Sequence, residues 1–263
     1  MNIHQMKNSI EVTKNAFERS FSNDSLYNKQ TQDEHHLQLI IGALELAAGM
    51  KVLDLGTGSG YLAFEIARNH PQARITGLDI VEKTLAINTK RAQDEGLTNL
   101  FFQSYDGMMF PFEDGEFDLV VSRYALHHFP MISDTFKEIS RVLKPEGKLF
   151  ISDPTPNSND AERFVDAYMK MKKDGHIKFY TEDEFKELAQ AVGLSFINCF
   201  KTSIRFPRKR IEAREFPKII ASYHREITEG YHIEVTEDEL YITEEVNNLL
   251  FYHRSNPSCD RTP

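Results

Sequence analysis

The sequence is poor in cysteine and in long apolar runs, and both shortages narrow the class of protein. Its 263 residues include two cysteines, Cys199 and Cys259, and neither stands in a Cys-x-x-Cys pair. We therefore expect no disulfide framework or thiolate zinc site, and two reduced thiols suit a cytoplasmic protein. No apolar run reaches the ~18 residues of a membrane span, since the best, 39–48, is interrupted by Glu45. A basic region followed by an apolar one is also missing from the start, so no secretory signal is expected.

Basic charge is in short supply as well. The chain carries 31 Lys and Arg against 40 Asp and Glu, a formal net charge of −9. A general nucleic-acid binder needs basic surface to neutralise phosphates, so we expect no nucleic-acid partner. One segment, 201–225, is locally basic, and we interpret it as a solvated face balanced by acids elsewhere. The hydrophobic share of 40% is that of an ordinary soluble globular protein.

Short apolar strands alternate with helices of ordinary length from residue 51 onward. Strands are predicted at 51–55, 74–79, 100–103, 117–121, 148–152 and 195–202, with closing strands in 231–254, most clearly at 248–252. This alternation predicts βαβ units and a parallel sheet with right-handed crossovers. Such α/β sheets bind ligands beyond the carboxyl ends of their strands, which is where the informative residues should lie.

Several segments fall outside this alternation and define the expected organisation. Residues 1–48 are expected to form an N-terminal helical cap, and 49–263 the main domain. Within that domain, 154–180 is expected to be a lid insertion and 203–263 a C-terminal elaboration. A capping box predicts a helix at 181–192.

The strongest local signal is the run Asp54-Leu55-Gly56-Thr57-Gly58-Ser59-Gly60, between a predicted strand and a predicted helix. Alternate glycines let the backbone turn sharply and approach a ligand. Acids follow the next two strands, at Asp79 and Asp106, and the first stands where a ribose diol would lie. A phosphate-binding P-loop is excluded, because the run has no Lys or Arg. The Gly-x-Gly-x-Gly spacing also disfavours a nicotinamide dehydrogenase. A ligand that has no phosphates and carries an ammonium and a sulfonium suits a pocket rimmed by acids better.

At this point the sequence resembles the class I S-adenosylmethionine-dependent methyltransferases. Within them it is similar to the branch that holds the ubiquinone/menaquinone-biosynthesis enzymes and many small-molecule methyltransferases. The resemblance spans about 51–193 and rests on the motifs 52–61, 77–80, Asp106 before 110–112, 117–120, 126–129 and 141–147. It implies a Rossmann-like, doubly wound, mostly parallel seven-stranded sheet with helices on both faces and an antiparallel last strand. It also implies S-adenosyl-L-methionine as cofactor and methyl transfer to a small organic acceptor by in-line displacement.

The resemblance also implies roles for particular residues. The backbone of Gly56 and Gly58 would cradle the methionine and ribose part, with Asp54 organising the loop, and Asp79 would accept both ribose hydroxyls. Asp106 would accept the adenine amino hydrogens, with a turn residue as the alternative interpretation. The other residues assigned to the cofactor are Tyr27, Thr57, Gly60, Ile80, Gly107, Met108, Ser122 and Arg123.

Two adjacent histidines, His127 and His128, are the candidates for a general base. An imidazole with an ordinary pKa suits proton removal near neutrality, and a purely structural role is the alternative. Adjacent histidines point in different directions, so we expect no metal site. An Asn/Asp-Pro-Pro-Tyr/Phe motif is missing at 122–125, which disfavours methylation of nucleobases or glutamine amides. A non-catalytic S-adenosylmethionine-binding protein and an RNA or protein methyltransferase stay open as alternatives, as does a homo-oligomer.

Overall fold

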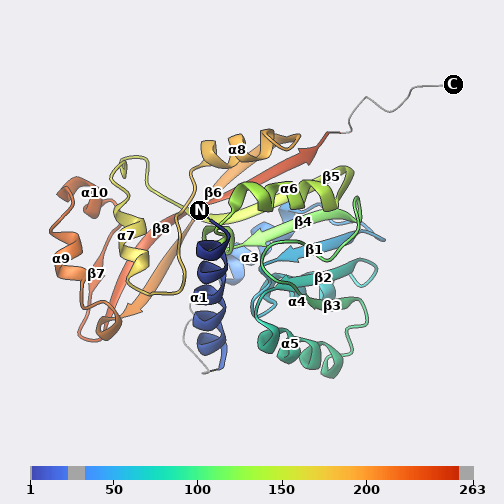
Figure 1. Cartoon of the computed structure of the whole chain (residues 1–263), viewed down its shortest axis with the longest axis horizontal. Coiled ribbons are helices and arrows are strands. Elements are labelled where there is room, and N and C mark those ends of the chain that lie inside the picture. The colour runs from blue at the N-terminus through green and yellow to red at the C-terminus, as the bar shows by residue number, and fades with distance from the viewer. Residues whose placement is uncertain (1, 23–32, 255–263) are drawn as a thin grey trace.

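The computed structural model describes residues 2–22 and 33–254, which form a mixed sheet with helices on both faces (Figure 1). Its strands are β1 (Lys51–Leu55), β2 (Arg74–Asp79), β3 (Leu100–Ser104), β4 (Phe117–Arg123), β5 (Leu143–Thr155), β6 (Leu194–Lys209), β7 (Glu234–Val235) and β8 (Glu239–His253). Its helices are α1 (Ile3–Ser22), α3 (Glu34–Ala43), α4 (Tyr61–Asn69), α5 (Glu82–Asp94), α6 (Ile132–Val142), α7 (Phe164–Lys170), α8 (Glu182–Gln190), α9 (Phe216–Ile220) and α10 (Arg225–Glu229). Two 3₁₀ turns lie at Leu126–His128 and Arg210–Glu212.

The sheet has the order β3-β2-β1-β4-β5-β8-β6, with β7 paired to β8. Strands β1 to β5 run parallel, and β8 is antiparallel to both β5 and β6. This confirms the Rossmann-like, mostly parallel sheet with an antiparallel last strand. The expected count of seven was wrong, because the described residues form eight strands. The extra one, β7, pairs through two residues with Tyr241 and Leu240, which is too short for an apolar pattern to show.

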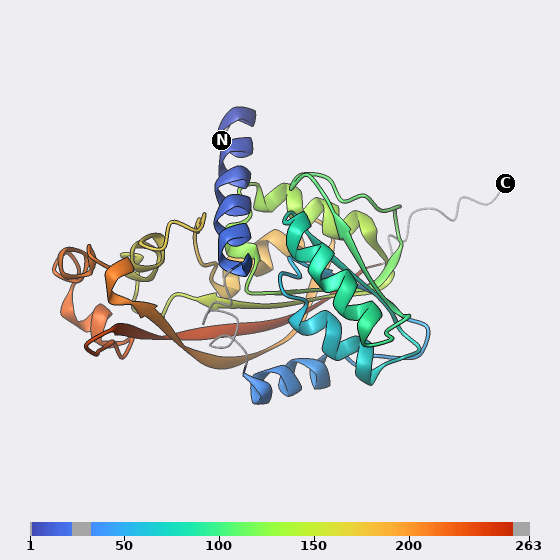
Figure 2. The ribbon, with the colours of Figure 1, turned by 90° about the horizontal axis from the view of Figure 1, so that it is seen from below.

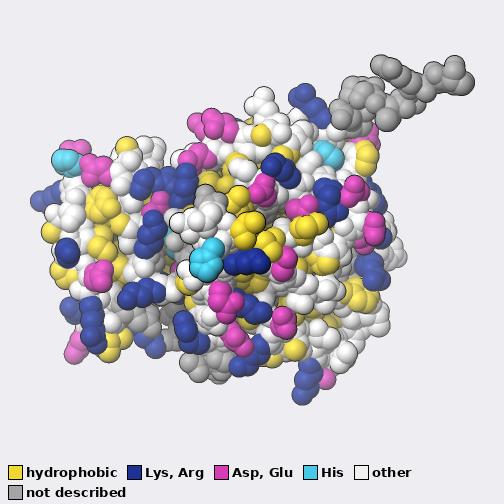
Figure 3. Space-filling view, in the orientation of Figure 1, with side chains coloured by type: hydrophobic (Ala, Val, Ile, Leu, Met, Phe, Trp, Pro, Cys, Tyr) yellow, Lys and Arg dark blue, Asp and Glu magenta, His cyan; other side chains and the backbone are white. Residues whose placement is uncertain are grey.

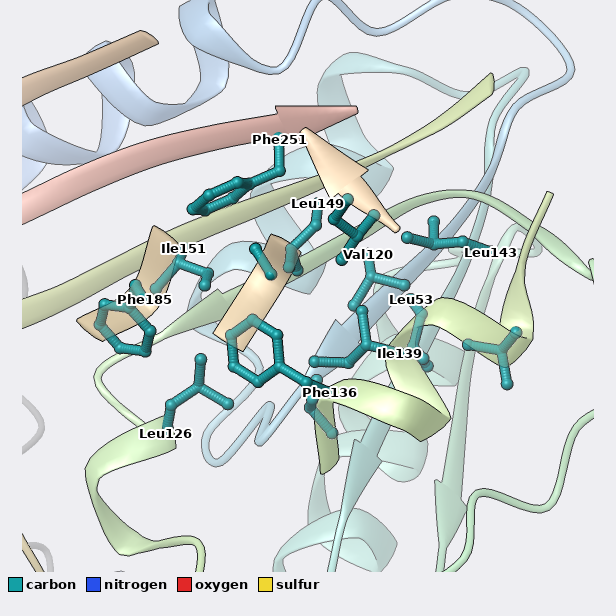
Figure 4. Packing of buried hydrophobic residues seen from close by; sticks show 14 of the residues in the cluster. Leu53, Val120, Leu126, Phe136, Ile139, Leu143, Leu149, Ile151, Phe185 and Phe251 are labelled. Carbon is teal, nitrogen blue, oxygen red and sulfur yellow. The ribbon is translucent and has the colours of Figure 1, made fainter. Parts of the chain in front are cut away.

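Side chains alternate between the two faces of the sheet, and a separate apolar cluster covers each face. On one face, α6 and α8 pack against the sheet through residues such as Phe136, Ile139 and Phe185 (Figure 4). On the other, α3, α4 and α5 pack against a second cluster that contains Ile40 and Phe64. The central strands of the sheet, β1, β4 and β5, are therefore covered on both faces, as strands of parallel sheets are.

The strands β5, β6 and β8 are longer than the sequence pattern predicts. They continue past the parallel part of the sheet toward α7, α9 and α10 (Figure 2). There a third apolar cluster forms, from α7, both long antiparallel strands and the segment between them. We call residues 156–180 and 204–246 the distal lobe. Residues 154–155, expected in an insertion, belong to β5.

Local signals account for several helix boundaries. Asp33 caps α3 by accepting a hydrogen bond from the His36 N–H at 3.1 Å. The predicted capping box is confirmed, since the Thr181 hydroxyl accepts from the Glu184 N–H at 3.2 Å and the Thr181 N–H donates to the Glu184 carboxylate at 2.9 Å. A helix both long and apolar enough to cross a membrane is not found in residues 2–22 or 33–254.

The basic segment 201–225 is only in part the solvated face that its charge predicts. Lys201 and Arg205 are exposed and pair with Glu245 and Glu234, each at 2.8 Å. The face shown in Figure 3 mixes side chains of both charges. Arg208, however, is only 3% exposed, so the interpretation was wrong for this residue. It lies on the covered face of β6, opposite Leu240.

Candidate active site

A cavity opens beyond the carboxyl ends of β1, β2 and β4, where strand order reverses and α/β sheets bind ligands. It encloses about 1070 Å³, its open mouth included. Nine of the predicted site residues line it: Asp54, Gly56, Thr57, Gly58, Asp79, Ile80, Gly107, Arg123 and His128. The remaining lining residues are Ile10, Thr13, Phe17, Ser59, Tyr61, Leu62, Val81, Tyr105, Tyr124, Ala125, Phe129 and Pro130.

The glycine-rich loop forms the floor of this cavity because it turns where side chains do not fit. Gly56 and Gly60 have φ angles of 72° and 76°. A Cβ on Gly56 would overlap that of Ala125, and one on Gly60 would lie 2.7 Å from the Phe64 ring. Gly60 thus serves the loop's packing and does not itself line the cavity. The loop's amide groups stay close to any ligand bound above them.

The Asp79 carboxylate lies at the end of β2, where backbone N–H groups hold it in place. One oxygen accepts from the Gly58 N–H and the other from the Val81 N–H, each at 2.9 Å. Each oxygen of a carboxylate has more than one acceptor position, so both keep capacity for ligand hydroxyls. Burial raises the pKa of Asp79 above its ordinary value. The side chain is thus oriented before any ligand arrives.

Asp54, at the end of β1, is the second acid of the cavity. Its carboxylate accepts a hydrogen bond from the Thr57 hydroxyl at 2.6 Å, which fixes the first turn of the loop. Burial raises the pKa of Asp54 to about 6. A cation bound nearby would favour its ionised form.

One wall of the cavity comes from α1, through Ile10, Thr13 and Phe17. Sequence reasoning missed these residues as site residues, although Phe17 stood out among polar neighbours. The loop after β3 packs directly on this helix, since a Cβ on Gly107 would lie 2.9 Å from Ile10. The cap residue that was predicted, Tyr27, lies outside the described residues.

Four further predicted residues do not line the cavity: Asp106, Met108, Ser122 and His127. Asp106 is exposed, and its carboxylate closes a turn by accepting from the Met108 and Met109 N–H groups at 2.9 and 3.1 Å. The buried Ser122 hydroxyl donates to the Leu55 carbonyl at 3.0 Å and so joins β4 to β1.

His127 is held by Asp153, a buried residue near the end of β5. Its Nδ1 lies 2.5 Å from one Asp153 oxygen, and its N–H donates to the other at 3.2 Å. Burial lowers the pKa of His127 and raises that of Asp153 to about 8. Burial thus favours the neutral form of both partners. The His127 ring packs against the His128 ring, and the two ring centroids are 4.3 Å apart.

His128 faces the cavity and meets the edge of the Phe17 ring, with centroids 5.0 Å apart. Its Nδ1 has no hydrogen-bond partner within the described part of the chain. Burial lowers the pKa of His128 to about 3, so the imidazole is neutral at pH 7. No set of three metal-ligating side chains gathers here or elsewhere in residues 2–22 and 33–254.

Tyr124, just after β4, forms another part of the wall in a backbone conformation that is unusual for a bulky residue. Its φ angle is 54°, which costs conformational energy and is found most often at functional sites. The Arg123 guanidinium lies over its ring, 3.9 Å from the centroid. Its hydroxyl lies 3.2 Å from Nδ1 of His36 on α3.

Comparisons with known proteins agree with this geometry. The uncharacterized methyltransferase YcgJ of Bacillus subtilis is 29% identical over 161 residues, 61% of this chain and 63% of that protein. A demethylmenaquinone methyltransferase of Lactococcus lactis is 36% identical over 102 residues, 38% of this chain and 40% of that protein. The chain therefore spans less than two thirds of these curated relatives.

Solved structures show the same fold over most of this chain. The crystal structure of YcgJ superposes with a TM-score of 0.74 at 22% identity, covering 85% of this chain and 100% of that one. A putative methyltransferase from Bacillus halodurans gives 0.75 at 21% identity, covering 84% and 100%. A family model described as a methyltransferase domain matches residues 46–206. Because this match covers more than half of the chain and takes in the parallel strands, the glycine-rich loop and most of the cavity wall, the chain belongs to the methyltransferase-domain family.

Proposed function

We propose that this protein transfers a methyl group from S-adenosylmethionine to a small organic acceptor by in-line displacement. The observation that carries the proposal is the Asp79 carboxylate, fixed by two backbone N–H groups at the edge of the cavity. Relatives named as methyltransferases of demethylmenaquinone, of sterols and of 27-O-demethylrifamycin SV support a small acceptor. The low cysteine content supports a cytoplasmic location.

The residues of the cavity fit the proposed cofactor. Asp79 would accept the ribose hydroxyls, and Ile80 would pack on the adenine. The backbone of Gly56 and Gly58 would face the methionine part, and Asp54 would stabilise its ammonium group. The loop between 54 and 60 has no basic side chain, which suits a ligand without phosphates.

When bound, S-adenosylmethionine supplies a methyl group on a positively charged sulfur, ready for attack by an acceptor atom. The protein contributes mainly alignment, because the donor is already reactive and holding two reactants in line removes a large entropic barrier. The walls formed by Phe17 and Tyr124 would exclude water from the reacting atoms.

A proton must leave only when the acceptor atom carries one. His128 is the residue we assign to receive it, because its neutral ring faces the cavity. With its pKa lowered to about 3, this histidine is a weak base, so it suits acceptors whose proton becomes acidic as the methyl group arrives. His127, held by Asp153, would position its neighbour.

Two measurements test the proposal. Calorimetry with S-adenosylmethionine and, separately, with NAD⁺ should show binding of the first alone. Formation of S-adenosylhomocysteine in the presence of small phenols, thiols and amines should then reveal turnover. Binding without turnover of any acceptor would favour the non-catalytic alternative, and binding of NAD⁺ alone would refute the assignment.

A further inference from the structure

A buried histidine lies directly behind the wall of the cavity. His36, in the first turn of α3, is 3% exposed. Its Nδ1 lies 3.2 Å from the hydroxyl of Tyr124, whose side chain lines the cavity. Its Nε2 lies 3.2 Å from Oδ1 of Asn248 on β8 and 3.1 Å from the hydroxyl of Thr202 on β6. One imidazole on α3 thus joins two antiparallel strands to a residue of the cavity.

The orientation of the Asn248 amide determines which ring nitrogen of His36 carries hydrogen. Nδ2 of Asn248 lies 3.3 Å from the Phe200 carbonyl and 3.4 Å from the Val246 carbonyl. Carbonyl oxygens only accept, so the NH₂ group must point to them, and Oδ1 is left to accept from His36. Burial lowers the pKa of His36 below its ordinary value, which favours the neutral ring. A neutral ring that donates from Nε2 has no hydrogen on Nδ1.

The Tyr124 hydroxyl therefore donates its single hydrogen to Nδ1 of His36. This hydrogen bond restrains one end of the Tyr124 ring, while the Arg123 guanidinium lies over its face, 3.9 Å from the centroid. The restraint is needed because Tyr124 has a φ angle of 54°. Such a conformation persists in a bulky residue only where the surroundings impose it.

The hydrogen bonds around His36 form a polar network in an otherwise apolar layer. The neighbours of His36 on α3, Leu37 and Ile40, belong to the apolar cluster on that face of the sheet. In such surroundings a paired polar network rigidifies its members, whereas an apolar side chain would serve stability as well or better. Fixing Tyr124 is a role that an apolar residue at position 36 could not fill, because only an acceptor holds its hydroxyl.

We propose that His36 is a positioning residue for methyl transfer, which holds the Tyr124 ring in the cavity wall by accepting its hydroxyl hydrogen. A fixed wall keeps the acceptor in line with the methyl group, so its loss should lower kcat more than it weakens binding. This inference rests on the proposed function, because a positioning residue has a role only where a reaction takes place.

Two substitutions of His36 each keep one of its two hydrogen-bonding positions. Asparagine places its amide near the position of Nδ1, so His36→Asn keeps an acceptor for the Tyr124 hydroxyl. Glutamine reaches as far as Nε2, so His36→Gln keeps a donor for Asn248 and loses the contact with Tyr124. A purely structural histidine would not distinguish between these contacts.

S-adenosylhomocysteine formation by the whole protein is measured with catechol, benzenethiol and aniline. With the acceptor that the native protein methylates fastest, His36→Gln should lower kcat from about tenfold, for the hydrogen bond alone, to about 100-fold, where the reactants are misplaced by about 1 Å. His36→Asn should stay within about threefold of the native kcat, because the Tyr124 hydroxyl keeps an acceptor. The KM for S-adenosylmethionine should change less than kcat in both variants.

His253→Gln is the matched control. Its Nδ1 lies 3.0 Å from the Lys144 carbonyl and its Nε2 lies 3.2 Å from the Ser140 hydroxyl, so this histidine also joins separate elements. It does not line the cavity, and its variant should keep kcat within about twofold. A native kcat in His36→Gln, an equal loss in His36→Asn, or a loss of the same size in His253→Gln would overturn the proposal.

Tyr124→Phe removes the hydroxyl through which His36 is proposed to act. In this background His36→Gln should lower kcat no further, because the two changes break the same hydrogen bond. Losses that multiply in the double variant would show that the two residues act independently, and they would overturn the proposal.

Nitrogen NMR spectra of protein labelled at histidine test the hydrogen bond without any acceptor. His36 should be neutral at pH 7 with its hydrogen on Nε2, and its signals are identified by their loss in His36→Asn. A hydrogen on Nδ1 would reverse the bond to Tyr124 and overturn the proposal. If the native protein binds no S-adenosylmethionine or methylates none of the three acceptors, the proposed function fails, whereas these spectra still report on the hydrogen bond.

Discussion

Replacing Asp79 with asparagine should cost most of the affinity for S-adenosylmethionine. The amide keeps the shape of the carboxylate, but its nitrogen cannot accept the N–H of Gly58 or Val81 that one carboxylate oxygen now receives. One ribose hydroxyl would also lose its charged acceptor, and the other would keep only a neutral one. A hydrogen bond to a charged group contributes about 1.5–3 kcal/mol. We therefore expect a total loss of about 2–4 kcal/mol, which corresponds to a Kd about 30- to 1,000-fold higher.

Calorimetric titration at neutral pH measures this change, and Asp118→Asn is the matched control. Asp118 also accepts a backbone N–H, from Lys51 at 2.8 Å, and pairs with Lys144 at 2.7 Å. It does not line the cavity, so its variant should bind with a Kd within about twofold of the native value. Circular dichroism would verify that both variants are folded. Native-like affinity in folded Asp79→Asn would refute the assignment of this carboxylate to the ribose.

Three further predictions follow from the same geometry. Gly56→Ala should lower the free energy of unfolding by about 1–3 kcal/mol more than Gly49→Ala. A Cβ at position 56 would overlap the Cβ of Ala125, whereas a Cβ at position 49 would meet no atom within 4 Å. Equal losses for the two variants in urea denaturation would contradict this. The pKa of Glu244 is raised from 4.5 to about 8, so its contribution to stability is complete below pH 4.5 and lost as the pH rises through 8. Glu244→Gln should therefore flatten the unfolding free energy across this pH window, and an unchanged profile would count against burial as the cause. His128→Asn should lower kcat by about 100-fold or more for acceptors that lose a proton while leaving cofactor affinity unchanged; unchanged S-adenosylhomocysteine formation would remove this histidine from the mechanism.

The parallel part of the fold is predictable because its strands are continuous apolar runs bounded by turn signals. Val52 and Leu53 illustrate this, since both are fully buried and belong to a run that reads directly as a buried strand. The extensions of β5, β6 and β8 are not predictable in the same way. Those of β5 and β6 contain Pro154 and Pro207, which usually mark strand ends. The strand form of all three depends on pairing with residues far away in sequence.

The residues of the candidate site differ in the same way, since some are predictable from local sequence and others are not. Asp54 stands two residues before the first glycine of the loop, and Asp79 is the last residue of β2. Their positions in the sequence therefore predict their positions in the fold. Tyr105 and Tyr124 reach the cavity through tertiary packing that no local spacing records. Arg208 belongs to a segment whose charge predicts exposure, yet it is buried and contacts Tyr168 and Met169 of α7.

The long strands have a consequence for anyone who wishes to shorten this protein. The family match ends at residue 206, near the end of β6 (Leu194–Lys209). A fragment trimmed there would lack β8, which bridges β5 and β6 over most of their lengths. Both would then present unsatisfied backbone edges to other chains, the usual route to aggregation. The parallel part of the sheet is therefore not separable from the distal lobe, and fragments meant to fold must keep residues through His253.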